Sequence, residues 1–268
     1  MRIWYQYPAP VDSFRRDVVW RSVQAIADRV RRPETEIEIV PVARGAAIAD
    51  GGHDARRLAN TEIIDTITGA NEGGYDGAVI GVSSDAGLLE AREILTVPVV
   101  GLTEAACHFA AIWGDRFGII TNPHAPGPGH LKDVHYRREQ LARYGVLDRL
   151  VGLEPLDMPA ERFRQDLAAR RHDEILTRYE AQARRLVEQG ADVILSGDTI
   201  LSMALVEHHF VDVPGTGAVV VDLISCAIKL IEALVDIRRA FGIVCSRAGI
   251  YAGMRPESVM AVRHTFSR

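Results

Sequence analysis

Short apolar runs alternate with long amphipathic stretches along the 268-residue chain. The short runs are rich in β-branched residues, which favours strands, whereas the long stretches repeat their apolar residues at helical spacing. In the first long stretch Val18, Val19, Ala25, Ile26 and Val30 recur in this way, with arginines between them. Because strands and helices alternate, the pattern predicts an α/β fold with parallel sheets joined by right-handed crossovers.

The same pattern predicts where each element lies. The expected strands are 2–6, 36–42, 77–82, 97–101, 117–121, 150–154, 192–196 and 218–221. The expected helices are 13–32, 55–70, 85–94, 103–113, 129–145, 160–188, 199–209 and 222–238.

The two halves of the chain resemble each other. Gly74-Tyr75-Asp76 precedes a strand that ends at Gly81, and Gly190-Ala191-Asp192 precedes a strand that ends at Gly197, 116 residues later. Further pairs are Val97-Pro98 with Val213-Pro214 and Gly101 with Gly217, both at offset 116, and Gln6-Tyr7-Pro8 with Thr121-Asn122-Pro123 at 115. Unrelated strand–helix–strand units also share glycines and strand-end prolines, but several matches at nearly one offset indicate an internal duplication.

The duplication predicts two similar domains, one formed by residues 1–103 and 217–268 and the other by 104–216. Ligands bind at the carboxyl ends of parallel strands. In a pseudo-twofold pair of domains, 81-GVSS-84 and 197-GDTI-200 are then the two walls of an active site in the interdomain cleft. Segments 6–10 and 121–127 are expected to flank it.

Composition narrows the class of protein. Apolar residues make up 47% and charged residues 25%, which is typical of a globular protein, and the net charge of −5 argues against a nucleic-acid partner. The N-terminus MRIWYQYPAP has no signal-peptide pattern, and no apolar run is long enough for a membrane span. Three widely spaced cysteines fit a reducing compartment, so we expect a cytoplasmic protein. An apolar face on 160–188 could serve a homo-oligomer.

Several segments carry a resemblance to a known family. They are 74-GYDGAVIGVSSDAGLLEARE-93, 98-PVVGLTEAA-106, 115-DRFGIITN-122, 190-GADVILSGDT-199 and 246-SRAGIYA-252. In their order and spacing they resemble the aspartate/glutamate/hydantoin racemase superfamily, closest to its hydantoin and allantoin racemase branch. That resemblance implies two similar α/β domains, an active site between them and no cofactor. It also implies two cysteines, which act as base and acid on opposite faces of a carbon next to a carbonyl.

The chain departs from the family at both cysteine positions. Val82 stands where the first cysteine is expected, and Asp198 stands at the second. The N-terminal loop is also altered, to Tyr7-Pro8-Ala9. Because valine can neither take nor give a proton, the sequence excludes a two-thiol mechanism and leaves proton chemistry to Asp198.

Asp198 is the candidate catalytic residue. It could transfer a proton, activate a water molecule or act as a nucleophile, and burial would raise its pKa and make it a stronger base. The alternative is that Asp198 only caps the helix that begins near Thr199.

The candidate substrate-binding residues are mostly small and polar. Hydroxyls and backbone N–H groups at a helix start can hold a carboxylate or enolate oxygen, although capping is again the alternative. The residues are Ser83, Ser84, Thr199, Thr121 and Asn122, with Tyr7 and Val82 lining the pocket.

No metal or cofactor motif is present: HExxH, paired CxxC, GxGxxG after a strand and P-loop spacing are all missing. The sequence therefore predicts a cofactor-independent enzyme for a small carbonyl or carboxylate compound, such as a hydantoin-like ring. An acid/base residue on only one face of the substrate favours hydrolase, lyase or isomerase activity. The alternatives are a true racemase with another second base, Tyr7 or Glu104, and a non-catalytic protein that binds a small ligand.

Overall fold

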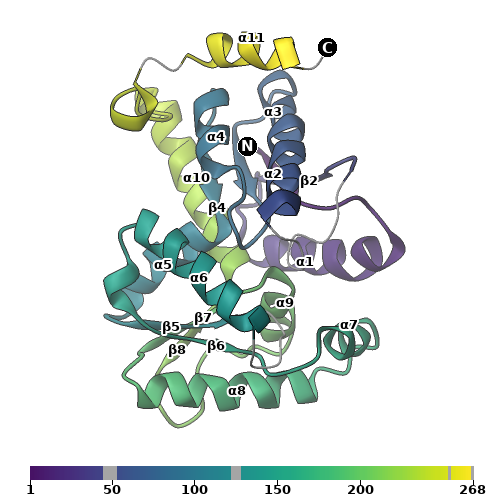
Figure 1. Cartoon of the computed structure of the whole chain (residues 1–268), viewed down its shortest axis with the longest axis vertical. Helices are drawn as coiled ribbons and strands as arrows, with labels where there is room; N and C mark the ends of the chain where they lie inside the picture. The colour runs from purple at the N-terminus through teal and green to yellow at the C-terminus, as the bar shows by residue number, and fades with distance from the viewer. Residues whose placement is uncertain (45–52, 122–127, 253–254, 267–268) are drawn as a thin grey trace. The chain divides into compact units, whose positions relative to one another are not determined.

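The computed structural model describes residues 1–44, 53–121, 128–252 and 255–266. The chain forms two compact units (Figure 1). The first unit contains Met1–Val11, Val30–Gly101 and Ile228–Arg268, and the second contains Asp12–Arg29 and Leu102–Ala227. This division differs from the predicted domains in three places, because residues 12–29, 102–103 and 217–227 all group with the second unit.

The first unit is built on a four-stranded parallel sheet with the order β2-β1-β3-β4. Its central strand β3 is buried along its whole length, as expected for a parallel sheet covered on both faces. The strands are β1 (Arg2–Tyr7), β2 (Glu36–Pro41), β3 (Gly77–Ile80) and β4 (Val99–Gly101). The helices are α2 (His53–Ile67), α3 (Gly69–Glu72), α4 (Leu88–Ile94), most of α10 (Leu223–Phe241), the short η4 (Gly249–Tyr251) and α11 (Pro256–Phe266).

The second unit repeats this arrangement, with a parallel sheet in the order β6-β5-β7-β8. Its strands are β5 (Phe117–Thr121), β6 (Leu150–Pro155), β7 (Val193–Ser196) and β8 (Val219–Val221). Its helices are η1 (Arg15–Trp20), α1 (Arg21–Val30), α5 (Leu102–Trp113), α6 (Pro128–Arg143), η3 (Leu147–Arg149), α7 (Ala160–Ala168), α8 (Asp173–Glu188) and α9 (Thr199–Glu207).

Helix α8 runs across one face of this second sheet (Figure 1). Leu186 packs so closely on β5 and β6 that a Cβ at Gly118 would lie 2.8 Å from it, and one at Gly152 would lie 3.0 Å away. The core of the unit continues from Leu186 through Tyr179 to Ile194, all fully or almost fully buried. The apolar stripe of α8 is therefore what fixes the sheet beneath it.

The matching strand orders confirm the α/β fold and its two similar halves, but the strand register corrects the predicted equivalences. Gln6 pairs with Ile80 and Ile120 pairs with Ser196, so Tyr7 is equivalent to Thr121 and not to Asn122. Val100 is equivalent to Val221, because Val79 pairs with the former and Leu195 with the latter. The offset of 116 therefore fails for the last strand of each sheet. The cause is an extra turn ahead of β8, closed by the hydrogen bond from Val213 N to Ala218 O.

Two predicted helices have different bounds. The single helix over 160–188 is wrong, since α7 ends at Ala168 and α8 starts at Asp173, with Arg170 in the left-handed region at φ 53°. The helix predicted from residue 85 begins at Leu88, because Asp85 and Gly87 both have positive φ. Helix α11 was not among the expected elements. Within the described residues, no helix combines the length and the apolar character that crossing a membrane requires.

Candidate functional site

Asp198 lies at the carboxyl end of β7, next to the end of β5. Gly197 makes this close approach possible, because a Cβ there would lie 2.8 Å from the Ile120 carbonyl and 3.0 Å from Cα of Thr121. The Gly197 N–H donates to that same carbonyl at 2.7 Å. The glycine therefore brings Asp198 and Thr121 to one edge of the sheet, as the sequence predicts for strand ends.

Asp198 is the N-cap of α9. Its Oδ1 accepts hydrogen bonds from the backbone N–H groups of Ile200 at 2.7 Å and Leu201 at 3.0 Å. The capping alternative is thus realised in the structure, but it uses a single oxygen. Both bonds that described residues donate to this carboxylate go to Oδ1, so Oδ2 is the oxygen available to a ligand.

Burial raises the pKa of the Asp198 carboxyl above its ordinary value. The two backbone hydrogen bonds and the positive charge of Arg137 work in the opposite direction, while Asp133 adds to the rise. The net direction is upward, as expected from the sequence. A carboxylate with a raised pKa is a better proton acceptor at neutral pH than one in water.

A buried arginine accompanies Asp198, and the sequence analysis missed it. Arg137 on α6 is 4% exposed. Its guanidinium donates to the Gly197 carbonyl at 2.5 Å, to Thr103 Oγ1 at 3.2 Å and to Gln140 Oε1 at 3.0 Å. Asp133 Oδ1 lies 3.9 Å from Arg137 Nε. This cluster holds the backbone of the residue directly before Asp198.

A signal for the cluster was present in the sequence. Asp133, Arg137 and Gln140 are spaced by four and three residues, which places them on one face of a helix. That face also carries the fully buried Leu141. A polar stripe on an inward face, rather than any local motif, would have indicated these residues.

Two threonines at the same edge provide hydroxyls. Thr121 ends β5 and is fully buried, and its Oγ1 has no hydrogen-bond partner among the described residues. Thr199 opens α9 and is 8% exposed. Asn122 lies outside the described residues. The second unit thus gathers Asp198, Thr199 and Thr121 in one place.

The equivalent edge of the first unit gathers the other predicted residues. Tyr7 ends β1 and is buried, and Val82 follows Gly81 directly after β3. Gly81 is required here, because a Cβ would lie 2.8 Å from the Gln6 carbonyl. Ser83 is 7% exposed, and the buried Ser84 hydroxyl has no hydrogen-bond partner among the described residues.

The path after Val82 differs from the path after Asp198. Asp85 turns the chain through a positive φ of 49°, and its N–H donates to the Val82 carbonyl at 2.9 Å. Its carboxyl group lies over Gly101, where a Cβ would be only 2.3 Å from Cγ of Asp85. The first unit therefore turns its carboxylate back onto its own sheet. The cleft predicted between the two walls stays a prediction.

Arg247 and two of the cysteines, which could in principle bind a ligand or react, have contacts or burial that fit a structural role. Arg247 Nη1 donates to the carbonyls of Arg92 and Glu93 at 3.3 Å, at the end of α4. Cys107 and Cys226 are buried free thiols, and burial raises the pKa of Cys226 well above the ordinary value. Within the described ranges, no group of three or more His, Cys, Asp or Glu side chains is placed to hold a metal ion.

Comparison of the sequence with known proteins identifies the family of this chain. The model of the Asp/Glu/hydantoin racemase family matches residues 17–231, and the chain belongs to this family. A hydantoin racemase of Paenarthrobacter aurescens is 28% identical over 231 residues, which cover 86% of this chain and 89% of that protein.

Solved structures agree with this assignment. An allantoin racemase from Klebsiella pneumoniae superposes with a TM-score of 0.72 at 28% identity, covering 94% of this chain and 93% of that one. An arylmalonate decarboxylase superposes with a TM-score of 0.54 at 14% identity, over 88% of this chain and 92% of the other, which shows a common fold alone.

Proposed function

We propose that this protein is a cofactor-independent enzyme that acts on a hydantoin-like ring or a related small carbonyl compound, with Asp198 as its one side-chain acid/base. The observation that carries the proposal is the state of Asp198. It is a carboxylate with a raised pKa and one oxygen that no described residue engages, placed at the end of a central strand. Groups of this kind cluster at active sites.

The substrate class rests on two considerations. The relatives are named as racemases of hydantoin and allantoin, and both compounds contain a ring carbon that bears hydrogen next to a carbonyl. Removing that proton creates an enolate, whose oxygen needs hydrogen-bond donors. Thr121 and Thr199 supply hydroxyls beside Asp198, and in the first unit Ser84 supplies a hydroxyl that has no partner among the described residues.

The mechanism follows from what each residue can do. Asp198 Oδ2 takes the proton from the ring carbon or from a water molecule, and the neutral acid later returns it. Arg137 stabilises the ionised form of Asp198 and fixes the Gly197 backbone that carries it. Val82, at the position equivalent to Asp198, cannot exchange a proton. Asp198 chemistry on one face then favours hydrolysis, elimination or isomerisation over inversion. The decarboxylase with the same fold is a named non-racemase, so the fold does not confine the reaction to racemisation.

Solvent exchange tests the proposal. Each enantiomer of a panel of 5-substituted hydantoins and thiohydantoins, together with a dicarboxylate set, is incubated with the protein in D₂O at neutral pH. Chiral chromatography with mass spectrometry follows deuterium and products against a protein-free blank. We expect turnover or label in one enantiomer only. Deuterium in both enantiomers at equal rates would instead identify a true racemase with a second base, such as Tyr7 or Glu104.

Two variants assign the chemistry to a residue. Asp198→Asn should lower the rate by about 10²–10⁴-fold, the usual contribution of a general acid/base. Asp222→Asn is the matched control, because Asp222 also caps a helix, accepting from Ser225 N at 2.8 Å, and burial also raises its pKa. That control should keep the activity. If no compound turns over and ligand affinity survives Asp198→Asn, the protein is a binding protein.

A further inference from the structure

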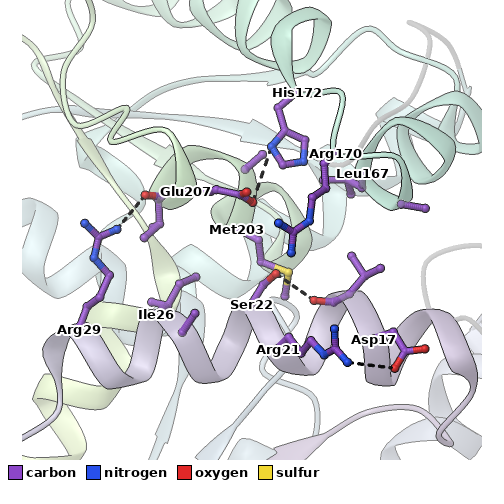
Figure 2. Close-up of a pocket in the computed structure, with 15 residues that line it drawn as sticks. Asp17, Arg21, Ser22, Ile26, Arg29, Leu167, Arg170, His172, Met203 and Glu207 are labelled. Atoms are coloured by element: carbon purple, nitrogen blue, oxygen red, sulfur yellow. Dashed lines mark hydrogen bonds and ion pairs between the residues drawn. The ribbon is translucent and has the colours of Figure 1, made fainter.

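A cavity of about 600 Å³ lies within the second unit (Figure 2), and neither Asp198 nor any strand residue lines it. One wall comes from η1 and α1, and the other comes from the α7–α8 junction and the second half of α9. The volume falls in the range of small-molecule sites. The charged and titratable residues of its lining are Asp17, Arg21, Arg29, Arg170, His172 and Glu207.

The break between α7 and α8 shapes this cavity. Helix α7 ends in a Schellman motif, in which Arg171 N donates to Asp166 O at 2.8 Å and Arg170 N donates to Leu167 O at 3.1 Å. Arg170 occupies the left-handed position of that motif, which glycine normally takes because it has no Cβ. A side chain there costs about 1 kcal/mol or more. The residue with this unfavourable backbone conformation is one that lines the cavity.

Arg170 also differs from the two other arginines of the cavity in its contacts with the described residues. Arg21 pairs with Asp17 at 4.0 Å, and Arg29 donates to the Val206 carbonyl at 3.0 Å. Arg170 has no hydrogen bond or ion pair from its guanidinium among the described residues, and its side chain extends past His172 toward α1 (Figure 2). A guanidinium that lines a cavity is a good partner for a carboxylate.

The charges and the apolar residues of the cavity wall indicate which kind of anion it could bind. Three arginines face two carboxylates, Asp17 and Glu207, so one positive charge is in excess. His172 is buried against His208, whose Nε2 lies 2.9 Å from His172 Nδ1, and against Glu207 at 3.8 Å. Burial lowers the pKa of His172, so it adds no charge at neutral pH. The rest of the wall is largely apolar and is formed by residues such as Ile26, Leu167 and Met203.

We propose that this cavity binds a small organic monoanion, with its carboxylate on Arg170 and its apolar body against Ile26, Leu167 and Met203. The site is separate from the Asp198 chemistry and does not depend on it. Binding there stabilises the α7–α8 junction against α1 and α9, because a ligand that binds only the folded state raises its stability.

Methyl NMR with 4-phenylbutyrate as the probe tests the proposal. The protein, which has five methionines, is labelled with ¹³C at the methionine methyl groups, and Met203→Leu assigns the signal of the cavity. We expect 4-phenylbutyrate to shift the Met203 signal with saturation and to leave Met158, fully buried in the core, unmoved. The neutral 4-phenylbutyramide should bind at least tenfold more weakly, and inorganic phosphate should not compete.

The variant Arg170→Gly distinguishes loss of the guanidinium charge from loss of stability. Glycine relieves the positive φ, so the melting temperature without ligand should stay equal or rise, while the dissociation constant for 4-phenylbutyrate rises at least tenfold. Asp157→Gly is the control, since Asp157 has the same backbone conformation, at φ 54°, but does not line the cavity. It should leave the dissociation constant unchanged. Equal binding of acid and amide, competition by phosphate, or unchanged affinity in Arg170→Gly would each overturn the proposal.

Discussion

The two units end their central strands in different ways. After β3 the chain passes Gly81 and Val82 and turns through Asp85, whose carboxyl group lies over Gly101. After β7 it passes Gly197 and enters α9 directly at Asp198, which leaves one carboxylate oxygen unengaged by described residues. The frame is duplicated, but the residues at the two equivalent strand ends differ. A duplicated fold therefore sets the positions at which a functional side chain can lie, and the residue at each position sets which chemistry is open to it.

Glu232 in the first unit and Asp198 in the second are carboxylates whose pKa values shift in opposite directions. Glu232 in the first unit is fully buried and accepts from Arg32 N at 2.8 Å, Thr35 Oγ1 at 2.7 Å and Lys229 Nζ at 2.5 Å. Burial alone would raise its pKa, but these donors outweigh it and the net direction is downward. For Asp198 the balance is upward. Hydrogen bonds and the charge of Lys229 outweigh burial at Glu232, whereas burial outweighs the two hydrogen bonds and the charge of Arg137 at Asp198.

The largest effect is expected at Arg137. Arg137→Met removes a buried cation and leaves the Gly197 carbonyl and Asp133 without their partner, which should cost about 3 kcal/mol of unfolding free energy. Because Arg137 lowers the pKa of Asp198, its loss should raise that pKa and move the acidic limb of the pH–rate profile to higher pH. Urea unfolding and a pH profile of kcat/KM measure the two effects.

The neighbouring Arg138, exposed on the same helix, provides the control for this variant. Arg138→Met should change stability by less than about 0.5 kcal/mol and leave the profile in place. An unmoved profile in Arg137→Met would mean that the arginine acts on the backbone alone.

Glu232→Gln should have the next largest effect and should act on stability only. Glutamine keeps an acceptor oxygen for Arg32 N and Thr35 but turns an NH2 group toward Lys229 and loses the charge, which should cost about 2 kcal/mol, with kcat/KM unchanged. The folded-state pKa of Glu232 is lowered, so its contribution is complete above the unfolded pKa of about 4.3 and is lost as the pH falls through the folded value. Unfolding curves between pH 3 and 7 should therefore be flatter for the variant. Glu90→Gln, on the exposed surface of α4, should match the parent, and equal acid sensitivity in all three proteins would contradict this account.

The sequence predicted the strands and the duplication because short runs of β-branched residues and repeated glycines and prolines mark both. All eight strands lie within about two residues of their predicted bounds, since short β-branched runs between glycines have few alternatives. The break at Arg170 could not be predicted, because no glycine or proline marks it. Similarly, the offset of 116 failed at β8, where the turn between Val213 and Ala218 displaces the strand along the chain.

Only the candidate site residues that lie within the repeated segments could be predicted from the sequence. Asp198 and Thr199 follow directly from the repeat, because they come straight after a buried strand and its glycine. Arg137 approaches Gly197 from a helix 60 residues earlier, and only the folded chain shows that contact. Long-range partners of this kind set the pKa of a site residue, so the direction of the Asp198 pKa could be expected from burial but its opposing causes could not.

A smaller effect separates capping from chemistry at Asp198. Asparagine caps helices as well as aspartate does, whereas alanine cannot, so Asp198→Ala should lose about 1 kcal/mol and Asp198→Asn should lose none. The raised folded-state pKa does not change this difference, because ionising Asp198 at neutral pH works against folding and neither alanine nor asparagine is ionised. Urea midpoints at constant m value measure it. Equal destabilisation by both substitutions would show that the carboxylate charge, and not the cap, holds α9.

The smallest effect tests whether the first unit takes part in substrate binding at all. The Ser84 hydroxyl is buried without a partner in the described part of the chain, so Ser84→Ala breaks no hydrogen bond there and should leave the melting temperature equal or slightly higher. If Ser84 donates to a substrate oxygen, KM should rise about fivefold, the equivalent of about 1 kcal/mol. Thr121→Val makes the same change at the second unit, where Thr121 Oγ1 is also buried and unpartnered among the described residues. A loss in Thr121→Val alone would confine substrate recognition to the unit that carries Asp198, whereas equal losses would show that both halves of the duplication still contribute a hydroxyl.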